Sequence, residues 1–103
     1  GVDKIFRKSK ELTNFLYNGL TSIKNHLNYF KIITPEDQSR RGAQLSLYIY
    51  DDADYIFELI SKKFIVDYRK PNVIRVAPVP LYNSYQEVYE FVEYFRKIIK
   101  SRQ

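Results

Sequence analysis

The stretch NVIRVAPVPLYNSYQEVYEF, residues 72–91, joins a strand pattern to a turn and the start of a helix, and it decides the fold. Within it, residues 73–77 are apolar except for Arg75. Alternate side chains of a strand point to opposite sides, so Ile74 and Val76 share one side and Arg75 lies on the other. Burying an unpaired guanidinium is costly. The pattern therefore predicts a strand whose aliphatic side meets a core while Arg75 leaves on the opposite side.

The residues that follow this strand predict a helix. Ser84 and Glu87 have the spacing of a capping box, in which both side chains bond free N–H groups at a helix start. Behind them, apolar residues recur at helical spacing and form one stripe: Val88, Phe91, Val92, Phe95, Ile98 and Ile99. We therefore expect an amphipathic helix after residue 84.

Three segments upstream have strand patterns. Residues 64–69, FIVDYR, precede the turn signal KPN and form a predicted hairpin with residues 73–77. Residues 29–34, YFKIIT, end at Pro35 before a polar loop. In residues 44–50, aliphatic and polar positions alternate, with Leu45, Leu47 and Ile49 on one side and Gln44, Ser46, Tyr48 and Tyr50 on the other.

Two further helices are predicted. Residues 3–27 carry apolar residues at spacings that suit a helix: Ile5, Leu12, Phe15, Leu16, Leu20, Ile23 and Leu27. Asp51, Asp52 and Asp54 suit the start of a helix that runs to Lys63, because carboxylates cap free N–H groups and favour the positive dipole end. A divalent-cation site is the alternative, but DDADYIF lacks the glycine and distal glutamate of a calcium loop.

The order of elements is therefore α-β-β-α-β-β-α. It predicts an α+β fold in which a small, mainly antiparallel four-stranded sheet has helices on one face, with residues 1–103 as a single domain. The other face of the sheet carries glutamine, serine, tyrosine and arginine. Such a face is unlike a core, and we expect it to meet solvent, another domain or another subunit.

Composition narrows the class of protein. The chain has no cysteine, no apolar run near the roughly 20 residues of a spanning helix, and no signal-peptide pattern at its start, so we expect a cytoplasmic protein without a membrane partner. The net charge is +5, and residues 1–50, with 8 basic and 4 acidic residues, carry most of the excess. A stand-alone basic module that binds RNA or protein is one hypothesis. No nucleic-acid signature accompanies the charge, so a solvated basic helix face, with no nucleic-acid partner, is the preferred interpretation.

The sequence contains no self-sufficient catalytic or metal site. His26 stands alone near a predicted helix end, where a capping or exposed histidine is the ordinary case. Three glycines cannot form a phosphate loop, and no nucleophile motif is present. Arg75 is the one candidate binding residue, and an ion pair with Asp67 or Glu58 inside the domain is an equally good interpretation of it.

Three stretches resemble one enzyme family. NVIRVAPVPLYNSYQEVYEFVEYF is similar to the C-terminal end of kynureninases, where an Arg-Val-Ala-Pro strand runs into a Pro-Leu-Tyr-Asn-Ser turn and the last helix. IITPEDQSRRGAQLSL at residues 32–47 agrees as well, and FRKSKELTNFL at residues 6–16 agrees more loosely. The resemblance covers nearly the whole chain in the right order.

The resemblance implies a part of a pyridoxal-phosphate enzyme of the aminotransferase fold type I. Kynureninases hydrolyse kynurenine or 3-hydroxykynurenine to an anthranilate and alanine in tryptophan degradation, as cytosolic homodimers. Their large domain supplies the cofactor lysine, and none of the ten lysines here has a similar context. The chain is thus expected to be the small C-terminal domain, inactive without the large domain and without bound pyridoxal phosphate.

One functional residue carries over from the resemblance. The family's arginine in the Arg-Val-Ala-Pro strand binds the substrate α-carboxylate, and it matches Arg75. Arg41 and Gly42 also match the family pattern but receive no role, while Tyr82 and Asn83 are expected to shape the turn. No catalytic, cofactor-binding or metal-binding residue is expected in this chain. The small domain of another class V aminotransferase-like enzyme is the alternative within the same fold.

Overall fold

The computed structural model describes residues 2–33, 44–77 and 84–102, which form three helices and four strands. The order is α-β-β-α-β-β-α, as predicted. Arg41, Gly42, Tyr82 and Asn83 lie outside the described residues. The elements are α1 (Val2–His26), β1 (Phe30–Ile32), β2 (Leu45–Ile49), α3 (Ala53–Ser61), β3 (Asp67–Arg69), β4 (Val73–Val76) and α4 (Tyr85–Ser101).

The four strands form one antiparallel sheet in the order β1-β2-β4-β3. Strands β3 and β4 pair as the predicted hairpin, with Asp67 opposite Arg75. Strand β4 also pairs with β2, where Ser46 lies opposite Arg75. Position 75 is therefore flanked on both sides by neighbouring strands, so the backbone that carries Arg75 is held in the middle of the sheet.

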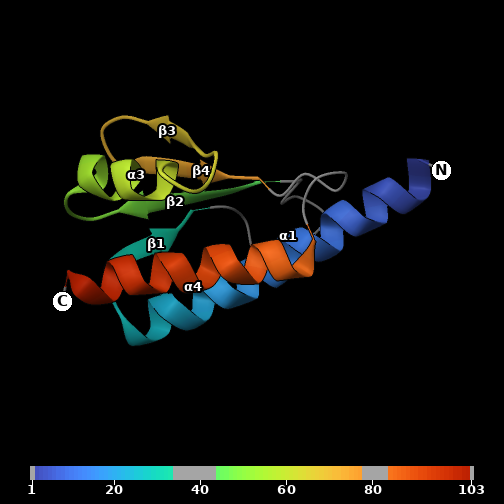
Figure 1. The fold of residues 1–103 in the computed structure, drawn as a ribbon, viewed down its shortest axis with the longest axis horizontal. Coiled ribbons are helices and arrows are strands. Elements are labelled where there is room, and N and C mark those ends of the chain that lie inside the picture. Colours follow the sequence, from blue (N-terminus) through green and yellow to red (C-terminus); the bar gives the residue numbers. More distant parts are fainter. Residues whose placement is uncertain (1, 34–43, 78–83, 103) are drawn as a thin grey trace.

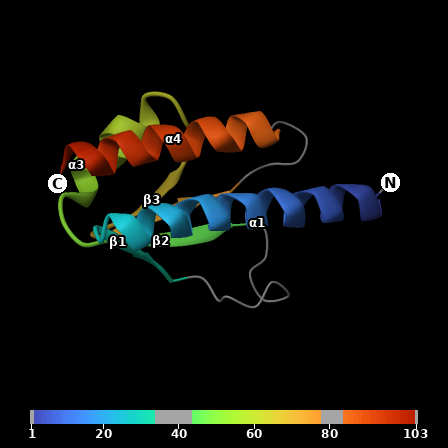
Figure 2. The ribbon, with the colours of Figure 1, turned by 90° about the horizontal axis from the view of Figure 1, so that it is seen from below.

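The helices and the sheet form two layers. Figures 1 and 2 show α1 and α4 side by side, running in the same direction across one side of the sheet. Helix α3 joins this layer because its Ala53, Ile56 and Ile60 belong to the same buried core, and Tyr94 of α4 donates a hydrogen bond to the Leu59 carbonyl at 2.8 Å. The opposite face of the sheet has no helix over it among the described elements.

The core follows the apolar positions of the sequence. Its members are fully or nearly buried, and they come from all three helices and from strands β1, β2 and β4: Leu12, Leu16, Leu20, Ile23, Phe30, Leu45, Leu47, Ile49, Ile56, Ile60, Ile74, Val76, Val88, Phe91, Val92, Phe95, Ile98 and Ile99. The predicted sides of the two central strands are thus confirmed. Phe15 is different, since it is 37% exposed and packs edge-on against Tyr85 instead of entering the core.

The start of α4 is the predicted one. The Ser84 side chain accepts a hydrogen bond from the Glu87 backbone N–H at 3.3 Å, which satisfies one of the free donors of the first turn. Glu87 also places a carboxylate at the positive end of the helix dipole. The start of helix α4 is therefore fixed by its own first turn, at Ser84.

The strand predicted over residues 64–69 is wrong for its first half, because β3 begins only at Asp67. The ring of Phe64 lies 5.2 Å from that of Phe91 and 5.7 Å from that of Tyr94, both on α4. This contact draws residues 64–66 toward the helices and away from β4. Strands β1, β2 and β4 lie within their predicted ranges and are shorter by at most two residues at either end.

The predicted capping of α3 by aspartate side chains is also wrong. Asp52 stands at the N-cap with φ 57° and makes no side-chain cap hydrogen bond. Its carboxylate instead forms an ion pair with Arg102 at the end of α4, while Asp54 accepts a hydrogen bond from Tyr68. Tertiary partners thus take two of the carboxylates that local reasoning assigned to the helix start. Helix α3 ends at Ser61, two residues before the predicted Lys63.

Candidate functional site

The face of the sheet that carries no described helix, here called the outer face, presents two rows of side chains. One row crosses β2, β4 and β3 through Ser46, Arg75 and Asp67. The next row crosses all four strands through Lys31, Tyr48, Val73 and Arg69. Because side chains two residues apart on a strand share a face, Arg69, Asp67 and Arg75 form one cluster there. The strand alternation places Arg75 on this side, as predicted.

Arg75 is half-buried and paired. Its side chain is 33% exposed, and its Nη1 lies 3.7 Å from Asp67 Oδ2. This distance is too long for a hydrogen bond, so the contact is a loose ion pair. Of the two intradomain partners expected from the sequence, the structure brings Asp67 to Arg75 and not Glu58. The structure is compatible with both interpretations of Arg75. Its guanidinium points out from the face of the sheet without helices, where a ligand could reach it, and it also forms an ion pair with Asp67 inside the domain.

The same carboxylate oxygen has a second and closer partner. Arg69 Nε donates a hydrogen bond to Asp67 Oδ2 at 2.9 Å. Two guanidinium groups therefore share one carboxylate, and the three side chains together carry one positive charge. Asp67 and Arg69 are 55% and 63% exposed, so water screens the Arg69–Asp67 pair, while the guanidinium of Arg75 lies deeper.

This arrangement suits an anionic ligand. A guanidinium presents N–H groups in a planar fork that can hold a carboxylate through two parallel hydrogen bonds. Among the described residues, Asp67 is the one charged partner of Arg75, and it leaves the donors of the fork unused at hydrogen-bonding distance. A carboxylate arriving at Arg75 would neutralise the remaining charge of the cluster.

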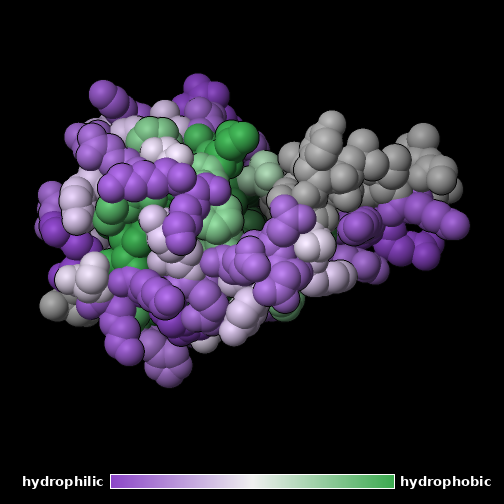
Figure 3. All heavy atoms as spheres, viewed as in Figure 1, coloured by the Kyte–Doolittle hydropathy of each residue, from purple (hydrophilic) through white to green (hydrophobic). Residues whose placement is uncertain are grey.

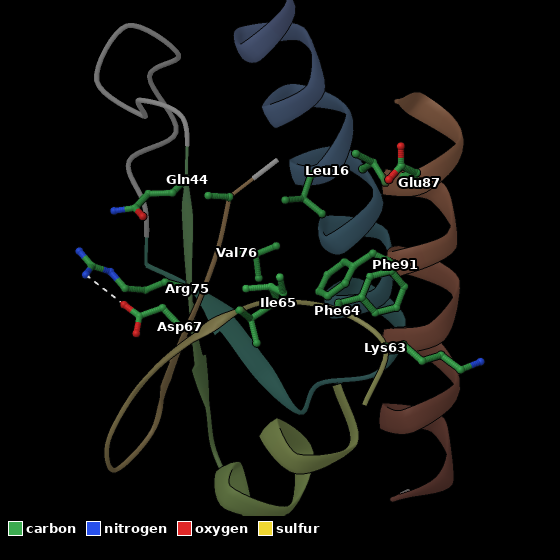
Figure 4. Close-up of a pocket in the computed structure, with 13 residues that line it drawn as sticks. Leu16, Gln44, Lys63, Phe64, Ile65, Asp67, Arg75, Val76, Glu87 and Phe91 are labelled. Carbon is green, nitrogen blue, oxygen red and sulfur yellow. Dashed lines mark ion pairs between the residues drawn. The ribbon is translucent and has the colours of Figure 1, made fainter. Parts of the chain in front are cut away.

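A groove of about 660 Å³ begins at this cluster. Figure 4 shows Arg75, Asp67 and Gln44 on one side of β4, with Phe64, Phe91 and Leu16 on the other side and Ile65 and Val76 between them. The groove is thus polar at the Arg75 end and apolar toward the helices. It opens where residues 64–66 leave β4, which links it to the unexpected shortness of β3.

Apolar surface accompanies the groove. Figure 3 shows hydrophobic surface gathered over α3 and the segment that follows it, surrounded by hydrophilic side chains. Ile65, in that segment, is 101% exposed. Sequence reasoning missed this residue because a strand over 64–69 would have left it on the edge of a regular sheet. Ile65 therefore adds a fully exposed apolar side chain to the lining of the groove that also contains Arg75.

The described residues that line the groove offer pyridoxal phosphate few of the groups it needs. That cofactor needs a lysine amine for its aldehyde, and Lys63 is the one lysine among the described residues that line the groove. Figure 4 shows Lys63 directed away from Arg75, and its Nζ lies 4.9 Å from the centre of the Tyr94 ring. The described part of the groove therefore does not fit the cofactor.

The remaining sequence candidates lie elsewhere. His26 is exposed at the last position of α1. Over residues 2–33, 44–77 and 84–102, no three histidine or acidic side chains gather as metal ligands, and none of the helices is long and apolar enough to cross a membrane. The outer-face tyrosines make ordinary surface contacts, with Lys31 over the Tyr48 ring and Tyr48 beside Tyr50. Arg69 was missed by sequence reasoning, although its spacing from Asp67 already placed it on the same side.

The architecture defines a class. The structure resembles a solved NifS-like protein with a TM-score of 0.78 over 96% of this chain and 29% of that one, at 19% sequence identity. At this identity the likeness concerns the fold, which is that of the small C-terminal domain of fold type I pyridoxal-phosphate enzymes.

Within that class, the chain belongs to the kynureninase C-terminal domain family, whose model matches residues 5–95. It is similar to kynureninase 2 of Neurospora crassa, with 47% identity over 98 residues that cover 92% of this chain and 21% of that protein. It is also 37% identical over 99 residues to the kynureninase of Flavobacterium psychrophilum, covering 94% and 23%. The chain thus spans about a fifth to a quarter of the length of these relatives.

Proposed function

We propose that this chain is the substrate-binding C-terminal domain of a kynureninase, in which Arg75 holds the α-carboxylate of kynurenine. The observation that carries the proposal is the position of Arg75 itself. It lies in the middle of the open sheet face, is partly desolvated, and keeps its hydrogen-bond donors unused by its loose partner Asp67. The family match supports kynurenine as the amino acid that brings the carboxylate, and favours this function over a related aminotransferase or a basic binding module.

The complete enzyme would act on L-kynurenine or 3-hydroxykynurenine, giving an anthranilate and L-alanine in tryptophan catabolism and NAD biosynthesis. Pyridoxal phosphate, held by a large domain that this chain does not include, would act as the electron sink of the reaction. We further propose that the enzyme is a cytoplasmic homodimer and that the 103 residues alone bind no cofactor and are inactive. The Lys63 geometry described above supports the cofactor part of this proposal.

Arg75 would contribute orientation as well as affinity. Two parallel hydrogen bonds to a carboxylate fix the plane of that group and so restrict rotation of the amino acid about its Cα. Holding the reacting bond in a productive direction lowers the entropic part of the barrier. Because Arg75 is anchored between β2 and β3, its backbone has little freedom, and the clamp would be set before the substrate arrives.

The proposal is tested in the full-length enzyme that carries this domain. Arg75→Ala is expected to lower kcat/KM for kynurenine by at least about thirtyfold, because loss of a charged, hydrogen-bonded partner costs about 2–5 kcal/mol. Steady-state kinetics would measure it, and circular dichroism would show that the variant is folded. A folded Arg75→Ala enzyme with the kcat/KM of the parent would remove Arg75 from the substrate site.

A further inference from the structure

We propose that Asp67 is a positioning residue for Arg75, and that the pull of Arg69 on Asp67 keeps Arg75 available for the substrate carboxylate. The inference rests on the proposed function. Asp67 lies directly opposite Arg75 in the register of β3 and β4, on the outer face of the sheet. A carboxylate in this position limits the directions in which the long arginine side chain can turn, without blocking the face that a ligand would approach.

The two distances from Asp67 indicate different roles for the two arginines. Asp67 Oδ2 accepts a hydrogen bond from Arg69 Nε at 2.9 Å but stays 3.7 Å from Arg75 Nη1. If Asp67 formed a close bidentate pair with Arg75, it would occupy the fork that a substrate carboxylate needs. Arg69 prevents this, because it holds the shared oxygen on its own side. Asp67 therefore attracts Arg75 over a distance at which it fixes direction and leaves the donors unused.

The charges predict that removing the Asp67 carboxylate has opposite effects on two quantities. Carboxylate affinity should stay the same or rise, while kcat should fall. Removing the Asp67 charge leaves Arg69 and Arg75 with two positive charges and no carboxylate between them, so any carboxylate should bind at least as tightly as before. The Arg75 side chain would then lack its neighbour on β3 and would hold the bound carboxylate in more than one orientation. Misplaced reacting groups reduce the rate of the chemical step. A purely structural role for Asp67 would not separate the two quantities in this way.

The test uses the full-length enzyme with three single substitutions in β3 and α3. Asp67→Asn removes the positioning charge, and Arg69→Gln removes the group that holds Asp67 away from Arg75. Glu58→Gln is the matched control, because it removes the same amount of charge from an exposed side chain of α3 that the structure does not bring to Arg75. Each variant is assayed for kcat and KM with kynurenine. Each is also assayed for inhibition by 4-oxo-4-phenylbutanoate, a carboxylate that lacks the α-amino group.

For Asp67→Asn, kcat is expected to fall about tenfold, while KM stays constant or falls and the inhibition constant of 4-oxo-4-phenylbutanoate falls about two- to fivefold. For Arg69→Gln, Asp67 closes on Arg75, so KM and the inhibition constant are expected to rise about three- to tenfold with kcat little changed. Glu58→Gln should leave all three quantities within about twofold of the parent.

The failure of this inference differs from the failure of the proposed function. If Asp67→Asn keeps kcat and the inhibition constant of the parent, or raises KM alone, Asp67 is not a positioning residue, even where Arg75→Ala is strongly impaired. If Arg75→Ala is itself like the parent, the proposed function has failed. Should Asp67→Asn not fold, Arg69→Gln still decides, because an inhibition constant equal to that of the parent would show that Asp67 does not compete for Arg75.

Discussion

Gly19 of α1 lies directly against the side chain of Val92 of α4, where the two long helices pack together. A Cβ atom added to Gly19 would lie 3.0 Å from both methyl carbons of Val92, which is closer than side-chain carbons normally pack. Val92 is nearly buried, and β-branched side chains have one strongly preferred rotamer in a helix. The absence of a side chain at position 19 therefore lets α1 and α4 lie side by side over the sheet.

The first prediction concerns this contact. Gly19→Ala should destabilise the chain by about 1 kcal/mol, because overpacking against Val92 outweighs the gain in helix propensity. In a Val92→Ala background the clash is absent, so the same substitution should stabilise by about 0.5–1 kcal/mol. Urea unfolding of the four proteins measures both steps. Equal changes in unfolding free energy in the two backgrounds would show that Val92 moves aside freely and that its contact with Gly19 does not limit the helix packing.

The second prediction concerns the link between β3 and α3. The hydroxyl of Tyr68 lies 2.6 Å from Asp54 Oδ1 and 2.9 Å from the Pro71 carbonyl, while its ring stacks on Phe57 at 4.8 Å. Tyr68→Phe keeps the stacking and removes the hydrogen bond, so it should destabilise by about 1–2 kcal/mol. Asp54→Asn, which leaves an acceptor for the same hydroxyl, is the control and should cost less. A Tyr68→Phe protein as stable as the parent would mean that water replaces the bond without loss.

The third prediction is a dependence on alkaline pH. Burial first, and then the hydrogen bond and negative charge of Asp54, raise the pKa of Tyr68 from 10.0 to about 12. A folded-state pKa above the unfolded one gives stability that is complete below pH 10 and is lost as the pH rises to 12. Unfolding free energies between pH 9 and roughly 12 should therefore fall more steeply for the parent than for Tyr68→Phe. Parallel pH profiles would contradict the prediction.

The fourth prediction concerns the backbone before α3. Asp52 has φ 57° and ψ 40°, a conformation that glycine adopts without strain and most residues do not. Its ion pair with Arg102 joins two partly exposed side chains, at 43% and 32%, and is worth less than about 1 kcal/mol. Asp52→Gly should therefore leave stability within about 0.5 kcal/mol, while Asp52→Ala should lose about 1–2 kcal/mol. Thermal unfolding that ranks alanine at or above glycine would contradict this account.

Local pattern predicted most of this fold, and long-range contacts decided the rest. The alternation of Leu45, Leu47 and Ile49 and the capping pair Ser84 and Glu87 are set by neighbouring residues, so the sequence alone could reveal them. The start of β3 at Asp67 could not be found in the same way. It depends on Phe64 meeting α4, a contact between segments that no local propensity describes.

The candidate site was likewise predicted in part from local pattern and decided in part by tertiary contacts. Alternation along β4 was enough to place Arg75 on the outer face, and the spacing of Asp67 and Arg69 put both on one side of their strand. Whether Asp67 would face Arg75 depended on the register of β3 against β4. Asp67 Oδ2 lies closer to Arg69 than to Arg75. This difference depends on side-chain geometry, which cannot be read from the pattern of residue types.

The last prediction separates charge from geometry at position 75. In the full-length enzyme, Arg75→Lys keeps a positive charge on the outer face but replaces the planar fork with a point charge. It should therefore recover part of the kcat/KM lost in Arg75→Ala, by about tenfold, and remain well below the parent. Steady-state kinetics with kynurenine measures the three enzymes together. A lysine enzyme equal to the parent would show that the fork is not needed. One equal to the alanine enzyme would show that charge without the fork contributes nothing to carboxylate binding.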